Sequence, residues 1–140
     1  MIPTLAGRWQ TRTLLTIFVG IPVTLGFCLL YNDFTTPLVL LGCVWLLGLL
    51  WDAVYQSLQD LRWDRDWPPL FLAVGALIEG LLVWNLVKAT VVWRILGLTV
   101  LPGIDPELTM LQFCGHYATV WLLTFFVMLG PLKVLFLKWR

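Results

Sequence analysis

The chain has 140 residues, of which 60% are hydrophobic and only 12% are charged. Soluble domains carry about 25% charged residues, so a water-soluble fold is excluded by the shortage of charge. The formal net charge of +1 gives no field that would attract nucleic acid, and no nucleic-acid partner is expected. The composition therefore predicts an all-α integral membrane protein, with residues 1–140 forming one domain in a lipid bilayer.

The first predicted membrane span covers residues 13–31. A helix needs about 20 mainly apolar residues to cross a hydrocarbon core of about 30 Å, and this run has that length. Pro22 lies at its centre and predicts a kink there. Arg8 and Arg12 precede the run as in a secretion signal, but no small-residue cleavage site follows it. We therefore expect an uncleaved first helix.

Three further spans of suitable length are expected at residues 38–58, 69–93 and 111–136. Pro69 suits the first turn of the third span, because proline lacks an N–H that would be unpaired there. The acidic residues of Asp105-Pro106-Glu107 are typical of a helix start and precede the fourth span. The predicted architecture is a four-transmembrane-helix bundle.

Basic residues are divided unevenly between the two sides of this predicted bundle. If the N-terminus is cytoplasmic, the outer side carries only Lys88 and Arg94. The cytoplasmic side then carries seven, namely Arg8, Arg12, Arg62, Arg65, Lys133, Lys138 and Arg140. Because cytoplasmic loops are enriched in Lys and Arg, both termini are expected in the cytoplasm, and the cell membrane is the expected location.

The segments between the spans have unusual compositions. Residues 59–68 form a predicted cytoplasmic loop that continues a polar stripe begun by Asp52, Gln56 and Gln59 at helical spacing. One interpretation is a solvated loop. The other is a docking surface for a membrane-protein partner, formed by Trp63, Trp67, Arg62 and Arg65. The outer segment 94–110 is too apolar for an ordinary loop, and its conformation stays open.

Glu79 is the most informative single residue, because it lies about ten residues into the third span, near the membrane midplane. An ionisable group at that depth costs about 2.5–3.5 kcal/mol on insertion scales and requires a partner. Asp52 on the second span lies at nearly the same height. Two carboxylates that face each other in a low dielectric do not both ionise, so one of them is expected to keep a proton.

This predicted polar site has two interpretations. It can be a proton or substrate site of a transporter, completed by Gln56, Tyr55 and hydroxyls among Thr24, Thr119 and Thr124. Alternatively, a protonated Glu79 links helices through a hydrogen bond, within this chain or to a partner subunit.

A second set of chemically active residues falls in the outer half of the predicted membrane region: Cys28, Cys43, Cys114 and His116. Three cysteines and one histidine can ligate zinc, and paired thiols can exchange disulfides. His116 alone can ligate a haem or a chlorophyll. The spacings match no known metal motif, and cysteine is an ordinary packing residue in apolar helices. No metal or cofactor is therefore expected.

No nucleophile–base pair, phosphate-binding loop, zinc-protease motif or dinucleotide fingerprint occurs in the chain, so an enzyme is not expected. The first function hypothesis is an accessory, assembly or scaffold subunit of a larger membrane complex, with a membrane-protein partner or a second copy of the chain. The alternative is a small proton-coupled transporter that uses Glu79 and Asp52.

Overall fold

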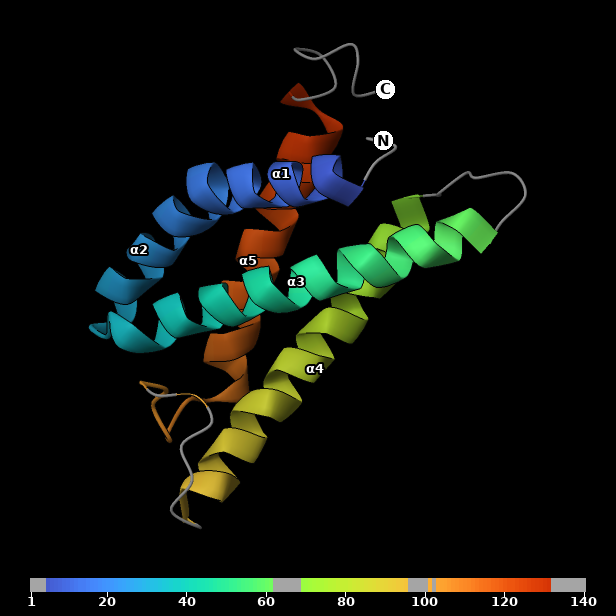
Figure 1. The fold of residues 1–140 in the computed structure, drawn as a ribbon. Helices are drawn as coiled ribbons and strands as arrows, with labels where there is room; N and C mark the ends of the chain where they lie inside the picture. Colours follow the sequence, from blue (N-terminus) through green and yellow to red (C-terminus); the bar gives the residue numbers. More distant parts are fainter. Residues whose placement is uncertain (1–4, 62–68, 96–100, 102, 132–140) are drawn as a thin grey trace.

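A computed structural model of the chain describes residues 5–61, 69–95, 101 and 103–131 (Figure 1). Its elements are α1 (Leu5–Leu15), the π-helix η1 (Thr16–Gly20), α2 (Ile21–Tyr31), α3 (Thr35–Leu61), α4 (Pro69–Ile95) and α5 (Met110–Leu129). The described residues include no β-strand, and four helical stretches are long and apolar enough to cross a membrane. The all-α class with four candidate spans is confirmed.

Three helix starts lie within three residues of their predicted positions, but the first helix begins at Leu5 instead of residue 13. The predicted span began after Arg12 because only apolar residues were counted. Arg8 and Arg12 are both good helix formers, however, and the helix contains them. The first candidate span is therefore Leu5–Tyr31, and it contains both arginines. The predicted end of the last span, residue 136, lies outside the described residues.

The kink predicted at Pro22 takes the form of a π-helical turn, which lies one turn before the proline. Because Pro22 has no N–H, the carbonyl of Phe18 has no i+4 donor, and the helix widens over Thr16–Gly20. The N–H of Ile21 donates to the carbonyl of Thr16 across this wide turn. Figure 1 shows the resulting bend between α1 and α2.

Short polar residues start α3 and α5. Oδ1 of Asp33 accepts hydrogen bonds from the N–H groups of Thr35 (2.8 Å) and Thr36 (3.4 Å) at the first turn of α3. Helix α5 begins with a capping box of Thr109 and Gln112. The predicted start signal at residues 105–107 was wrong in detail, because Oδ1 of Asp105 accepts from the N–H of Glu107 within the preceding loop.

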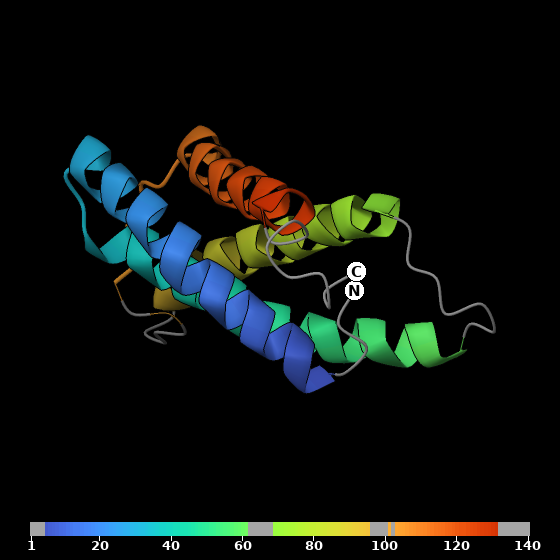
Figure 2. The ribbon, with the colours of Figure 1, turned by 90° about the horizontal axis from the view of Figure 1, so that it is seen from above.

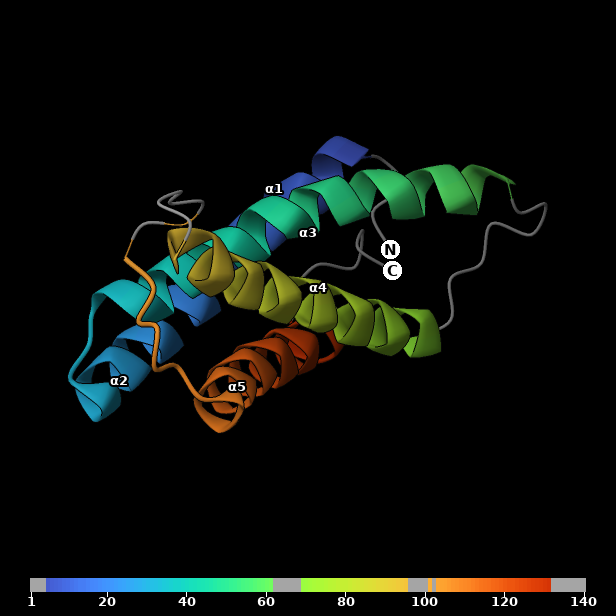
Figure 3. The same cartoon turned by 90° about the horizontal axis from the view of Figure 1, so that it is seen from below.

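Helices α1 and α2 run beside α3, and α5 lies beside α4 (Figure 2). At the end with the α2–α3 turn and the start of α5, the apolar core is dense. It is formed by Leu40, Cys43, Val83, Val87, Ile104, Leu108 and Phe113. The described part of the apolar segment 94–110 belongs to this core, because Ile104 is buried in it and Leu101 packs against it. Figure 3 shows α5 beside α4, away from the start of α1.

The predicted docking residues Arg62, Trp63, Arg65 and Trp67 lie outside the described residues, as do most residues of the predicted loop 59–68. The partner hypothesis for that loop stays a prediction.

Candidate functional site

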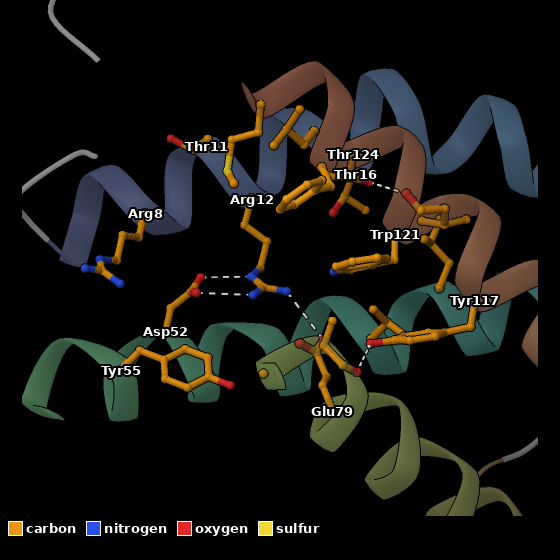
Figure 4. A pocket seen from close by; sticks show the side chains of 18 of the residues that line it. Arg8, Thr11, Arg12, Thr16, Asp52, Tyr55, Glu79, Tyr117, Trp121 and Thr124 are labelled. Carbon is orange, nitrogen blue, oxygen red and sulfur yellow. Dashed lines mark hydrogen bonds and ion pairs between the residues drawn. The ribbon is translucent and has the colours of Figure 1, made fainter. Parts of the chain in front are cut away.

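Three charged side chains from three helices meet inside the bundle (Figure 4). Arg12 of α1 binds Asp52 of α3 at two points, with Nε 2.8 Å from Oδ2 and Nη2 3.2 Å from Oδ1. Its third nitrogen, Nη1, lies 3.4 Å from Oε1 of Glu79 on α4. The Arg12, Asp52 and Glu79 side chains are 25%, 12% and 7% exposed. We call these three residues the charged cluster.

Two glycines leave the space that the charged cluster and its neighbour require. A side chain at Gly48 of α3 would overlap the Arg12 guanidinium, which therefore lies directly against the α3 backbone. A Cβ atom at Gly80 would lie 2.7 Å from Cε1 of Tyr117. The Tyr117 hydroxyl donates to the carbonyl of Ala76 (2.7 Å) and so ties α5 to α4.

The charged cluster lines a cavity of about 220 Å³ between α1, α3, α4 and α5. One wall is polar, with Tyr55 of α3 near the cluster and Arg8 farther along α1 (Figure 4). The facing wall belongs to α5 and is largely apolar and aromatic. It is formed by Tyr117, Val120, Trp121, Phe125 and Met128. The rings of Trp121 and Phe125 stack with their centroids 5.2 Å apart.

The structure brings Asp52 and Glu79 to one place, as predicted, but it inserts a cation between them. From the sequence, Arg12 is expected to flank the first span on the cytoplasmic side, and the carboxylates of Asp52 and Glu79 are expected to face each other directly. That expectation was wrong, because the longer first helix carries Arg12 into the bundle. A basic residue at the end of an apolar run gives the same sequence signal whether it flanks the membrane or turns inward.

Gln56 does not join the charged cluster as predicted. Its amide donates to Oδ1 of Asp60 one turn further along α3 (3.2 Å). Two other members of the predicted polar stripe face α1, since Asp52 binds Arg12 and Gln59 accepts a hydrogen bond from Arg8. The stripe therefore pairs α3 with α1.

The candidate hydroxyls go to different places. Thr124 lines the cavity, whereas Thr119 donates to the carbonyl of Gly115 (2.7 Å). Thr24 is fully buried, and its Oγ1 lies 2.9 Å from Nε2 of His116. Only Tyr55 and Thr124 of the predicted accessory residues therefore line the cavity with Glu79 and Asp52.

The cysteine–histidine set is not assembled into a metal site. Cys28, Cys43 and Cys114 are free thiols, the first two buried and the third exposed. Within the described ranges, no group of three or more His, Cys, Asp or Glu residues could hold a metal ion. His116 instead contacts Thr24 and the edge of the Phe27 ring.

No protein-family model, curated protein or solved structure matches the chain. The site must therefore be interpreted from its own chemistry.

Proposed function

We propose that the chain is a multi-pass integral membrane protein of the cell membrane, with both termini in the cytoplasm. We further propose that it is a small proton-coupled transporter whose cavity exchanges a proton for a small organic cation. The four apolar helices support membrane insertion. Large apolar side chains such as Phe18, Leu29, Leu50 and Leu77 point outward at 66–73% exposure, as expected of lipid-facing residues.

The observation that supports transport is an excess of one carboxylate in the buried cluster. Arg12 donates two hydrogen bonds to Asp52 and makes one longer contact with Glu79. Arg8 lines the same cavity and its charge attracts Asp52, but its side chain lies away from Glu79 (Figure 4) and donates to Gln59 near the end of α3. With both carboxylates ionised, the three residues carry one net negative charge in a low-dielectric site.

A net charge at this depth is unfavourable, and two ligands can neutralise it. One is a proton on Glu79. The other is a cation in the adjacent cavity. Only one of them is needed at a time, so the binding of a cation releases the proton as Glu79 passes from carboxylic acid to carboxylate. This competition is the basis of coupled exchange.

The cavity wall favours an organic cation over a metal ion. The faces of Trp121, Phe125 and Tyr117 suit an ammonium group with an apolar body, since aromatic rings attract cations through their negative faces. A scaffold protein has no need for such a cavity, whereas a transporter requires one.

The test uses benzyltrimethylammonium, a permanent cation with an aromatic ring, and the purified protein in detergent. Titration calorimetry in buffers of different ionisation enthalpy measures both the affinity and the protons released per ion bound. We expect release approaching one proton per ion. In Glu79→Gln, we expect affinity to fall at least tenfold and proton release to vanish.

Glu107→Gln is the matched control, because Glu107 is exposed and does not line the cavity. It should bind and release protons as the wild type does. Absence of binding by the wild type, or equal proton release from Glu79→Gln, would show that the proposal is wrong.

A second candidate function is the accessory or assembly subunit, and one feature of α5 favours it. Only Phe113 and His116 are buried among the residues of this helix, and its large apolar side chains Leu111, Leu122, Leu123 and Phe126 are exposed, so part of its surface is free to contact another subunit. Purification in mild detergent, with native mass and identification of co-purifying subunits, tests this role. A stoichiometric foreign subunit that is lost on changing Trp63 and Trp67 would support it; a monomer or a homo-oligomer alone would refute it.

A further inference from the structure

A second, smaller cavity lies toward the α2–α3 turn, away from Arg8. This crevice of about 60 Å³ lies under the α2–α3 turn and the loop before α5. Polar residues of both connections line it, namely Tyr31, Asp33, Thr36, Asp105 and Gln112. Its volume exceeds the approximately 10–15 Å³ that one water molecule requires, so it can admit water and protons.

Among the described residues, His116 is the only one that lines both the cavity and the crevice. It is 3% exposed and lies between them on α5. Its Nε2 is 2.9 Å from Oγ1 of Thr24, and its ring meets that of Phe27 edge-on with centroids 5.3 Å apart. The imidazole is therefore part of a thin wall between two polar compartments.

We propose that His116 transfers protons through this wall, between the crevice at the α2–α3 end and Glu79 in the cavity. The inference rests on the proposed proton-coupled function and adds the route of the proton. Under it, the organic cation and the proton reach Glu79 by separate routes, the cation through the cavity and the proton through the crevice.

The two ring nitrogens of histidine make this transfer balanced. A neutral imidazole accepts the proton released by Glu79 on one nitrogen and becomes an imidazolium. It then gives up the proton of its other nitrogen toward the crevice and returns to the neutral form, so no net proton stays on the ring. The Thr24 hydroxyl, which can donate and accept, hydrogen-bonds Nε2 and so orients the imidazole for this transfer. In this proposal, water in the cavity carries the proton between His116 and Glu79, and the cavity of about 220 Å³ has room for it.

Charged groups lie on both sides of this wall. Carboxylates of Asp33 and Asp105 line the crevice, and Glu79 lies in the cavity. The titratable and charged groups that share these compartments with His116 are Arg8, Arg12, Asp52, Tyr55, Glu79 and Tyr117 in the cavity and Tyr31, Asp33 and Asp105 in the crevice.

The experiment uses the full chain in liposomes loaded with a pH-sensitive dye. An imposed gradient of benzyltrimethylammonium drives proton movement, which the dye reports, and the calorimetric titration described above reports binding in parallel. In His116→Gln, we expect proton flux to fall at least tenfold while the affinity for the ion stays within twofold, because glutamine keeps a hydrogen-bonding group but cannot take up and release a proton.

A conservative pair at Thr24 provides a second test that does not change His116. Thr24→Ser keeps the hydroxyl and should keep at least half of the flux. Thr24→Val has nearly the same shape but no hydroxyl, and its flux should fall severalfold. A purely structural role of the Thr24–His116 contact would instead lower stability in the valine variant without changing the flux per folded molecule.

Failure of this inference can be separated from failure of the proposed function. If the wild type neither binds the ion nor moves protons, both are wrong. If Glu79→Gln abolishes flux but His116→Gln conducts within twofold of the wild type, transport stands and the His116 route is wrong. If His116→Gln does not fold, equal flux in Thr24→Val and Thr24→Ser overturns the route.

Discussion

The two ends of the bundle are built on different principles. At the α2–α3 end, Leu40, Val83, Val87, Ile104 and Phe113 pack into an apolar core. Toward the other end, α1, α3, α4 and α5 surround a cavity of about 220 Å³ that is lined by the Arg12–Asp52–Glu79 charged cluster. Close packing of small and apolar side chains gives one end its rigidity. At the other end, the side chains pack less closely, and they enclose a cavity and buried charges.

This contrast separates residues that stabilise the fold from residues that are available for chemistry. Buried ionisable groups are expensive in a membrane and are retained where they have a use. The core keeps the helices in fixed positions, so the charged cluster keeps its geometry although the cavity beside it is open. Three sets of substitutions at the two ends and one substitution beside the crevice measure how strictly this division holds.

The largest expected effect is that of Arg12→Met, which leaves two buried carboxylates without their cation. Breaking a buried ion pair in this way costs about 3–5 kcal/mol. Unfolding in mixed SDS micelles measures the loss. Lys88→Met is the control, because Lys88 is exposed and its contact with the Trp84 ring is worth about 1 kcal/mol at most.

A triple variant, Arg12→Met with Asp52→Leu and Glu79→Gln, should recover most of that stability, since neutral residues of similar volume remove the unpaired charge. If the triple variant is as unstable as Arg12→Met alone, the charged cluster is needed for folding and the proposed division between the two ends is wrong.

The same truncation at both ends gives the next largest effect. Leu40→Ala removes a side chain that is 2% exposed in the dense core, and it should cost about 3–5 kcal/mol. Leu15→Ala removes a buried side chain that already borders the cavity, so fewer contacts are lost, and we expect about 2 kcal/mol. Comparison of the two free energies of unfolding checks the contrast directly, and equal losses would contradict it.

Substitution of two glycines on α3 compares a tightly packed position with an open one in the same helix. Gly48→Ala places a methyl group on the Arg12 guanidinium and should destabilise the fold by about 1–3 kcal/mol. A Cβ atom at Gly42 meets no heavy atom within 4 Å, so Gly42→Ala should be neutral or stabilising by up to about 1 kcal/mol. The same micelle titration measures both, and a neutral Gly48→Ala would mean that Arg12 has room to move.

The smallest effect is expected at Asp33, beside the crevice and between two helices. The hydroxyl of Thr36 and the N–H groups of Thr35 and Thr36 lower the pKa of Asp33 from its ordinary value of 3.8. A lowered pKa means that ionised Asp33 stabilises the fold above that ordinary value and that this contribution is lost as the pH falls through the folded-state pKa. Asp33→Asn should remove this acid dependence, at a cost near neutral pH of about 1 kcal/mol or less. Stability measured from pH 6 to pH 2.5 checks it, and an unchanged acid profile would contradict the capping role.

Sequence reasoning predicted the helices better than the site. Apolar run length predicted the starts of three of the four long helices to within three residues, and Glu79 was singled out by its position in the third apolar run. Asp52 was matched to Glu79 by height, and the structure joins them through Arg12. Gln56 was assigned to the same polar stripe as Asp52, but its amide hydrogen-bonds Asp60, one turn farther along α3.

The sequence by itself determined the class of fold, because hydrophobic length and the scarcity of charge are local properties of the chain. It also determined that a buried acid requires a partner. Only the tertiary structure decided which partner, because the choice depends on how a lengthened first helix crosses α3 and on the space left by Gly48. The same is true of His116: its place between two cavities is set by α2, α5 and both end connections together, and no spacing in the sequence records it.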